Sequence, residues 1–300
     1  MSGRRVYAPT VNILLTNDDG IHAPGIRSLH RALTGQLPAD ALGTTEPLGE
    51  VTTVAPATAQ SATSHGVTFH EPLMTRQTEI NSGVGVAVEG RPADCVKLGL
   101  TNLWPAMHGR GSRPDLAISG MNAGANVGIN VLYSGTIGAA VEAAFLGIPA
   151  IAVSMHLDYG PSDEAPSPTA ERALSSEPPD FDRAAALARH VIDRLIAGGL
   201  PERHEIISIN IPATQHWREP GDVPVTVCPM NTHALVDRYE QRRAPNGATY
   251  YWAAGHGLDF VGADDGTDVT ELFERRVTVT PLRYDMTNRD RMEAWRDRLS

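Results

Sequence analysis

The feature that most constrains this chain is a short apolar run that ends in two adjacent carboxylates. Residues 11–16 are almost all apolar, and Asp18, Asp19 and Gly20 follow them closely. An apolar run of this length is typical of a parallel strand that is buried on both faces. Apolar residues then recur at helical spacing between positions 26 and 33. Strand, acidic turn and helix in this order predict a ligand site at the carboxyl end of a strand in an α/β sheet.

The same succession of strand, loop and helix recurs as far as residue 212. Further strands are predicted at residues 51–56, 67–69, 84–88, 116–119, 150–154 and 205–212. Helical patterns lie between several of them, most clearly at 139–146 and 184–195. This alternation predicts an α/β fold in which helices cover a mostly parallel sheet.

Two segments depart from this alternation. Residues 158–180 are rich in proline, serine and acidic residues, which predicts a surface insertion or linker. Beyond residue 212 the pattern weakens to separate β segments and an amphipathic helix near the end of the chain. A tail of this kind often packs against the core or against a partner subunit. We therefore expect a catalytic core at 1–212 and a C-terminal arm at 213–300.

Composition excludes several classes of function. The 300 residues carry a net charge of −10, whereas binding a nucleic-acid polymer needs a concentrated basic face. A small phosphorylated substrate is not excluded, because a local site can bind it. No apolar run is long enough to cross a membrane, and a signal-peptide pattern is missing from the printed N-terminus. We expect a cytoplasmic protein whose two cysteines are reduced.

The second informative stretch is the glycine-rich sequence at 119–138. Its glycines allow the backbone to approach a ligand closely, and its asparagines supply amide groups. Ser134, Gly135 and Thr136 then lead into a helical pattern, and a helix N-terminus with nearby hydroxyls is a natural phosphate site. A plain helix cap by Ser134 or Thr136 is the alternative, and it is compatible with anion binding. Neither a Walker loop nor a dinucleotide fingerprint is present here.

Oxygen donors therefore come from several predicted strand ends. They are Asp18 and Asp19, a hydroxyl between 58 and 64, and an asparagine between 122 and 126. Taken alone, the acidic pair could equally cap the following helix. Two adjacent carboxylates repel each other, however, and a divalent cation held by oxygen ligands would compensate them. Carboxylates with neutral amide and hydroxyl ligands suit Mg²⁺ or Mn²⁺, and an anion pocket beside such a metal indicates phosphoryl chemistry.

These motifs together resemble those of the SurE survival-protein family. The matching stretches are 16–26, 60–61, 91–96, 119–126, 133–136, 209–212, 250–252 and 279–282. The resemblance covers nearly the whole chain and implies a Rossmann-like three-layer fold. It also implies a C-terminal arm that is exchanged between the subunits of a homodimer or homotetramer. The implied activity is a metal-dependent phosphatase that acts on nucleoside 5′- and 3′-monophosphates, with short polyphosphate as a further candidate substrate.

The resemblance also implies which residues form the site. Asp18, Asp19, Ser61 and Asn122 correspond to the ligands of one divalent metal per subunit, Mg²⁺ or Mn²⁺. Asp18 and Asp19 are then the catalytic carboxylates as well. Water can attack phosphorus directly, or an aspartyl-phosphate can form, and the sequence leaves both routes open.

By the same resemblance, the family's phosphate-binding loop corresponds to Asn126 and the segment 134–136 of this chain.

Three places depart from the family's usual pattern. Arg91 stands where the family usually has threonine after Gly90, the segment at 158–180 is longer and more acidic than expected, and 243–247 reads Arg-Ala-Pro-Asn-Gly. None of these departures affects the implied metal ligands.

Two other functions are alternatives to this one. A haloacid-dehalogenase-type phosphatase needs two aspartates separated by one residue, but Asn17 lies two positions before Asp19 and Gly20 two positions after Asp18. That chemistry is therefore disfavoured. A non-catalytic sensor that binds nucleotides or anions in the same pocket is the second alternative, and an assay of phosphate release with and without EDTA separates it from the enzyme.

Overall fold

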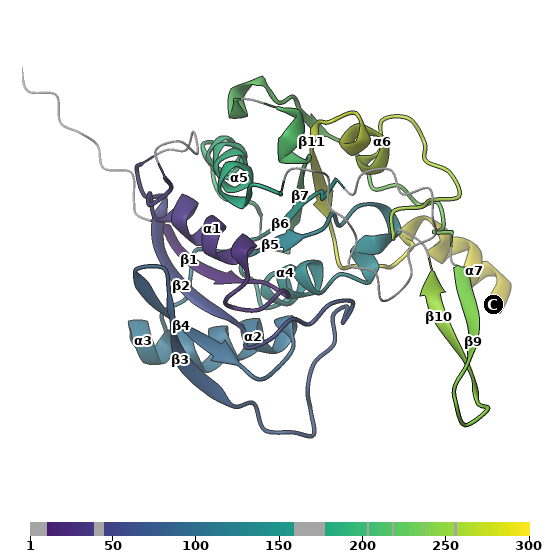
Figure 1. Ribbon diagram of the computed structural model, residues 1–300, viewed down its shortest axis with the longest axis horizontal. Coiled ribbons are helices and arrows are strands. Elements are labelled where there is room, and N and C mark those ends of the chain that lie inside the picture. The colour runs from purple at the N-terminus through teal and green to yellow at the C-terminus, as the bar shows by residue number, and fades with distance from the viewer. Residues whose placement is uncertain are drawn as a thin grey trace, which may run out of the picture.

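The computed structural model describes residues 11–38, 45–158, 178–202, 204–217, 219–236, 238–254 and 257–300. At its centre lies a nine-stranded sheet in the order β3-β4-β2-β1-β5-β6-β7-β11-β8 (Figure 1). The strands are β1 (Val11–Thr16), β2 (Gly49–Pro56), β3 (Thr75–Ile80), β4 (Gly83–Val88), β5 (Leu116–Ala123), β6 (Ala150–Met155), β7 (Ile206–Ile211), β8 (Val225–Val227) and β11 (Val277–Leu282). Most of the predicted insertion at 158–180 lies outside the described residues.

The sheet is mostly parallel, as predicted. Strands β4, β2, β1, β5, β6 and β7 run parallel to one another, whereas β3 is antiparallel at one edge. At the other edge β11 pairs antiparallel with β7, and β8 runs parallel to β11. Parallel strands buried on both faces require apolar residues on both faces. Strand β1 meets this requirement, because Ile13 and Leu15 join one hydrophobic core and Leu14 joins the other.

Helices cover both faces of the sheet and complete the three layers (Figure 1). The helices α1 (Pro24–Leu33) and α5 (Phe181–Ile196) pack together on one face, and α2 (Pro92–Leu98) and α4 (Gly135–Phe145) pack together on the other. Short helical segments complete this part of the chain: η2 (Gly99–Leu103), α3 (Trp104–His108), η3 (Gly128–Leu132), η4 (Thr214–His216) and η5 (Pro220–Asp222). The predicted α/β fold class is thereby confirmed. None of the helices in the described ranges is sufficiently long and apolar to span a membrane.

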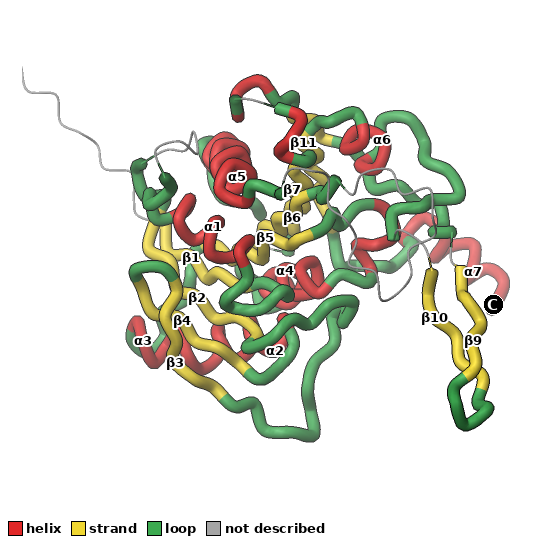
Figure 2. Tube along the Cα trace, in the orientation of Figure 1, coloured by secondary structure: helices red, strands yellow, loops and turns green. Residues whose placement is uncertain are grey.

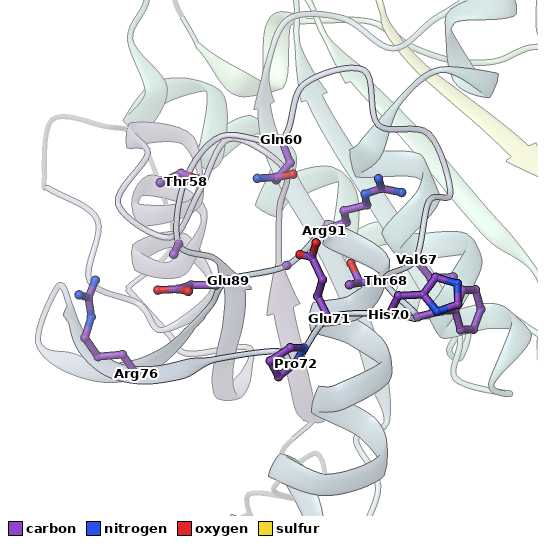
Figure 3. A pocket seen from close by; sticks show the side chains of 13 residues that line it. Thr58, Gln60, Val67, Thr68, His70, Glu71, Pro72, Arg76, Glu89 and Arg91 are labelled. Carbon is purple, nitrogen blue, oxygen red and sulfur yellow. The ribbon is translucent and has the colours of Figure 1, made fainter.

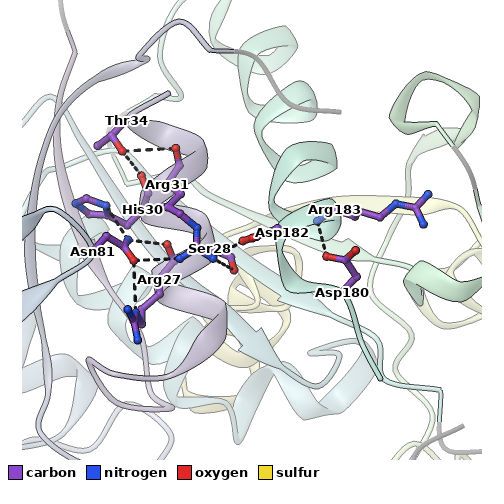
Figure 4. Close-up of polar contacts among 9 residues, drawn as sticks. All are labelled: Arg27, Ser28, His30, Arg31, Thr34, Asn81, Asp180, Asp182 and Arg183. Carbon is purple, nitrogen blue, oxygen red and sulfur yellow. Dashed lines mark hydrogen bonds and ion pairs between the residues drawn. The ribbon is translucent and has the colours of Figure 1, made fainter. Parts of the chain in front are cut away.

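A polar network ties α1 to its neighbours (Figure 4). Asn81 lies in the turn between β3 and β4 with a φ of +51°, a conformation that asparagine adopts more readily than most residues. Its side-chain amide donates a 2.9 Å hydrogen bond to the carbonyl of Arg27 and accepts one of 3.0 Å from Arg31. Arg31 also pairs with Asp182 on α5. The turn, α1 and α5 are therefore held together on one side of the sheet.

Two predicted elements differ from the structure. The predicted strand at 67–69 is not a strand, and the edge strand β3 pairs with β4 instead. Strand β3 has a polar, mainly exposed sequence, so it lacks the alternating apolar pattern that marks a half-buried strand. Helix α4 begins at Gly135 rather than at residue 139, because the side chain of Ser134 caps it.

The C-terminal segment divides into two parts. Strands β8 and β11 belong to the main sheet, so the sheet continues beyond the predicted boundary at residue 212. The hairpin of β9 (Arg238–Arg243) and β10 (Thr249–Ala254) forms a separate two-stranded sheet that projects from the molecule (Figure 2). The remaining helices are α6 (Asp268–Phe273), η6 (Arg289–Arg291) and α7 (Met292–Leu299). No residue of α7 is buried.

Candidate active site

The candidate site lies where the direction of the sheet connections reverses. Strand β1 has β2 on one side and β5 on the other, so the loops that leave their carboxyl ends diverge. Ligands of open α/β sheets bind in the crevice at such a switch point. The predicted site residues lie on these loops and on the first turn of α4. The chain order of the elements therefore determines the position of the site.

Asp18 lies in the turn that connects β1 to α1. Its side chain is only 6% exposed, and one carboxylate oxygen accepts a hydrogen bond from the hydroxyl of Thr136. Burial raises the pKa of Asp18 to about 6, against the lowering effect of the Thr136 hydroxyl and with a further rise from Asp19. A methyl group at Gly135 would lie 2.9 Å from the second oxygen, Oδ2. Asp18 is thus in direct contact with the beginning of α4.

Asp19 faces the end of β5. Its Oδ2 accepts a 2.8 Å hydrogen bond from the backbone N–H of Ala123, and burial raises its pKa despite this bond. Asn122 is the residue next to Ala123, and its amide nitrogen donates a 2.7 Å hydrogen bond to the carbonyl of Gly124. This bond orients the amide and leaves its oxygen available as a ligand. The structure therefore brings Asp18, Asp19 and Asn122 to neighbouring strand ends.

Ser61 reaches the same region on the loop at 57–66, which follows β2. The N–H of Gln60, the preceding residue, donates a 2.7 Å hydrogen bond to the carbonyl of Asp18. Gly20 packs against the backbone of Thr58 in the same loop, with a φ of +97° that favours glycine. Ser61 itself is exposed. The loop is thus bound to the acidic turn through its backbone, and its hydroxyl is open to solvent.

The predicted phosphate-binding residues take two different positions. Ser134 caps α4, because its side chain accepts a 3.1 Å hydrogen bond from the N–H of Ile137. Asn126 is buried, its amide nitrogen donates to Ser154 at 2.8 Å, and its backbone N–H donates to Asn210 at 2.8 Å. Its side chain is therefore engaged with β6 and its backbone with β7. A role for Asn126 in phosphate binding remains a prediction.

Two buried carboxylates that the sequence analysis did not identify support these loops. Glu142 on α4 lies 2.7 Å from the imidazole of His65 and 3.4 Å from the ammonium of Lys97, and its side chain is 3% exposed. Burial acts to raise the pKa of Glu142, but His65 and Lys97 outweigh it and the pKa is lowered. Glu142 is the only charged residue in α4, and this isolated charge in an apolar helix is the sequence signal that could have identified it.

The second carboxylate comes from the C-terminal segment. Asp268 on α6 is buried and accepts a 2.9 Å hydrogen bond from the N–H of Gly128 and one of 2.8 Å from the N–H of Asn231. Burial raises its pKa, although these backbone bonds lower it in part. The glycine-rich loop is therefore held by a residue 140 positions further along the chain, which local sequence does not indicate.

The donor set suits a hard divalent cation rather than zinc. Three-membered clusters of histidine, cysteine, aspartate or glutamate are not found within the described ranges. Asp18 and Asp19 instead offer two adjacent carboxylates, whose pKa values are raised mainly by burial, with a hydroxyl and an amide on neighbouring segments. Mg²⁺ and Mn²⁺ accept such oxygen ligands. Cys95 and Cys228 are both buried.

The chain is similar to known proteins of one family. A sequence profile of the family described as survival protein SurE matches residues 13–234. A protein named 5′-nucleotidase SurE from Rhodopirellula baltica is 40% identical over 96% of this chain and 98% of its own length. Another of that name, from Carboxydothermus hydrogenoformans, is 37% identical over 93% and 92%. The crystal structure of a SurE protein from Aquifex aeolicus superposes with a TM-score of 0.71 at 30% identity, over 96% of this chain and 99% of that one.

Proposed function

The chain belongs to the survival protein SurE family, and on that premise we propose that it is a 5′-nucleotidase, an enzyme that hydrolyses the phosphate monoester of a nucleotide. The products are a nucleoside and inorganic phosphate. The observation that carries the proposal is the buried carboxylate of Asp18 in contact with the first turn of α4. A pocket of this kind places a carboxylate beside backbone N–H groups that bind phosphate.

The first turn of α4 holds the phosphate. Its N-terminal N–H groups have no partners within the helix, and they favour a negative charge. Gly135 has no side chain, so the carboxylate of Asp18 packs directly against the backbone of this turn. Ser134 and the segment up to Thr136 supply the remaining donors of the phosphate loop, together with Asn126. These groups are in place before the reaction, which is what makes such stabilisation effective.

Asp18, Asp19, Ser61 and Asn122 hold one divalent metal ion per subunit, Mg²⁺ or Mn²⁺. The adjacent carboxylates of Asp18 and Asp19 and the amide of Asn122, which is oriented by its bond to Gly124, support this assignment. When bound, the ion supplies Lewis-acid polarisation of a phosphate oxygen and neutralises charge. The chain's own part is to present four oxygen ligands from two loops and the end of β5, and to hold the two carboxylates against their mutual repulsion.

The carboxylates then act on the reacting atoms. One of the two aspartates either accepts the proton of the attacking water or attacks phosphorus itself, and water releases the phosphate in the second case. Thr136 donates to Asp18 and keeps that carboxylate oriented. The ester oxygen leaves on the nucleoside and takes up a proton. We also propose that 3′-monophosphates are substrates, with short polyphosphate as a further candidate.

The active protein is a homodimer or homotetramer in which the C-terminal arm is exchanged between subunits. The hairpin of β9 and β10 projects from the molecule and exposes Tyr239, Tyr251 and Trp252. Helix α7 exposes Met292, Trp295 and Leu299 on a segment without buried residues. Apolar side chains on projecting elements are typical of contacts with another subunit. We place the enzyme in the cytoplasm, with a nucleoside monophosphate as its substrate.

Phosphate release from the four common 5′-monophosphates, measured with Mg²⁺ or Mn²⁺ and after EDTA treatment, tests the proposal. We expect release with either metal and its loss after EDTA. Binding of nucleotide without any release would indicate the non-catalytic sensor instead. A haloacid-dehalogenase mechanism stays disfavoured, because Asn17 is fully buried and its amide donates to the carbonyl of Gly20.

A further inference from the structure

A cleft of about 730 Å³ lies beside the acidic turn, between the loops that follow β2 and β4 (Figure 3). Thr58 and Gln60 form part of its wall. The same loop binds the acidic turn, since the N–H of Gln60 donates to the carbonyl of Asp18. A ligand whose phosphate lies at Asp18 therefore has this cleft as its neighbouring space. The volume is within the range of small-molecule pockets.

Phe69 gives this cleft an aromatic surface. It lines the cleft and is 77% exposed, which is unusual for a phenylalanine. The preceding residue, Thr68, is fixed by Asp94, which is 2% exposed. Both the N–H and the hydroxyl of Thr68 donate to this carboxylate, at 2.8 and 2.7 Å. The backbone that carries Phe69 is thus held rigidly by a buried group, and its ring stays in contact with water.

Arg91 is held by the same buried carboxylate as Thr68. Its N–H donates a 2.9 Å hydrogen bond to Asp94, so the same carboxylate fixes both Thr68 and Arg91. The guanidinium lies against Gly66, where any side chain would collide with it. Within the described part of the chain, no carboxylate forms an ion pair with Arg91. Its charge is available to a ligand.

The charges of the cleft indicate what kind of group it takes. Arg76 and Arg91 carry positive charge and Glu71 and Glu89 carry negative charge, and all four line the cleft (Figure 3). These charges balance, so the cleft as a whole does not favour a second phosphate. A flat ring with hydrogen-bonding edges and a polyhydroxyl group fits better, because aromatic side chains stack on nucleobases of any kind.

We propose that this cleft is the nucleoside subsite of the enzyme, in which the base stacks on Phe69 while the phosphate lies at Asp18 and the first turn of α4. This inference rests on the proposed nucleotidase function and deepens it. Phe69 is then a specificity-determining residue, because it distinguishes nucleotides from phosphate esters that have no base. Asp94 is a positioning residue that acts through Thr68.

The test compares two substrates in the full-length enzyme with its divalent metal. One is the best of the four common nucleoside 5′-monophosphates, and the other is ribose 5-phosphate, which lacks the base. Stacking of the usual strength corresponds to roughly 5- to 100-fold in kcat/KM. We expect Phe69→Ala to lower kcat/KM for the nucleotide by that factor, mainly through KM, and to leave ribose 5-phosphate unchanged. If turnover of ribose 5-phosphate is too slow, its inhibition constant replaces KM.

Matched variants separate this effect from a loss of structure. Phe69→Trp keeps a stacking surface and should retain nucleotide turnover, and Phe145→Ala removes an exposed phenylalanine from the far end of α4 and should change neither substrate. Free adenosine provides a readout without phosphate chemistry. It should inhibit the unmodified enzyme competitively and inhibit Phe69→Ala at least 5-fold more weakly.

Three results would overturn the subsite. The first is an equal change in kcat/KM for both substrates in Phe69→Ala, and the second is no change for either substrate in that variant. The third is a loss of activity in Arg91→Gln that is confined to nucleoside 3′,5′-bisphosphates, because this result would assign the cleft to a second phosphate. Failure of the proposed function is a different result, because the unmodified enzyme would then release phosphate from neither substrate.

Discussion

The imidazole of His65 lies 2.7 Å from the buried carboxylate of Glu142, and this contact fastens the loop at 57–66 onto α4. The same loop carries Ser61, and α4 carries the phosphate-binding turn. Ser64, in the same loop, forms two hydrogen bonds to the segment that comes just before α4. Its N–H donates to the carbonyl of Tyr133, and its hydroxyl donates to the carbonyl of Leu132. The contact between Glu142 and His65 therefore joins the two halves of the proposed site.

This contact predicts a dependence of stability on pH. The pKa of Glu142 is lowered in the folded state, so its stabilising effect is complete above the pKa of the unfolded chain and is lost as the pH falls through the folded value. We expect Glu142→Gln to lower the free energy of unfolding by about 2 kcal/mol at neutral pH, because a buried ion pair is broken. Denaturant titrations at pH 7.5 and below about pH 4 should show the difference shrinking. A difference that grows in acid would contradict the assignment.

Asp19→Ala should abolish phosphate release without unfolding the protein. The side chain accepts a bond from Ala123 and otherwise adds negative charge beside Asp18, so its removal relieves repulsion in the metal-free protein. Thermal unfolding with and without Mn²⁺ provides the second measurement. The ion should raise the Tm of the unmodified protein, since ligands stabilise the state that binds them, and should not raise that of the variant. Unchanged turnover, or a variant that does not fold, would show that the ligand assignment is wrong.

Gly135→Ala should reduce activity far more than stability. The added methyl group would lie 2.9 Å from Cβ and Oδ2 of Asp18 and 3.2 Å from the ring of Pro92, so the carboxylate must move. Displacement of a catalytic group by about 1 Å can reduce the rate on the order of 100-fold. Gly198→Ala is the matched control, because a methyl group there meets open space. Equal rates for the two variants would show that the position of Asp18 is not critical.

Removal of α7 should change the assembly and not the subunit. Its residues are all exposed, with Trp295 at 54%, so deletion of residues 290–300 leaves the core intact. Sedimentation analysis should show a smaller mass than that of the full chain, while the unfolding midpoint measured at low protein concentration stays the same. Leu200→Ser, which changes an exposed apolar residue outside the C-terminal segment, should leave the mass unchanged. An unaltered mass for the deletion would contradict an arm exchanged through α7.

Local sequence determines the part of the site that could be predicted. The strand that ends before Asp18, the glycines of the phosphate loop and the helix that begins near Ser134 each follow from a few consecutive residues. Their meeting point follows as well, because carboxyl ends of parallel strands lie at one edge of a sheet. The fold class was predictable for the same reason, since most of the parallel strands and the helices between them carry their own apolar period.

The remaining features depend on partners that are distant in the sequence. Glu142 and His65 are 77 positions apart, and nothing in the Ala-rich sequence of α4 indicates which residue pairs with its carboxylate. Strand β3 is polar because it lies at an exposed edge, so no apolar alternation marks it. The place of β11 beside β7 depends on an antiparallel pairing that forms only in the folded chain.

The position of β11 also determines how incomplete chains behave during synthesis. Strand β8 is made first, yet in the sheet it pairs with β11 alone, and β11 covers the edge of β7. Strand β7 has the sequence Ile-Ile-Ser-Ile-Asn-Ile and is fully buried in the finished protein. A chain that stops before residue 277 therefore leaves a long apolar strand with a free edge, the arrangement that recruits other strands and aggregates. Fragments of this kind should collect in the insoluble fraction of an expressing cell, which makes premature termination a route to aggregation as well as to loss of activity.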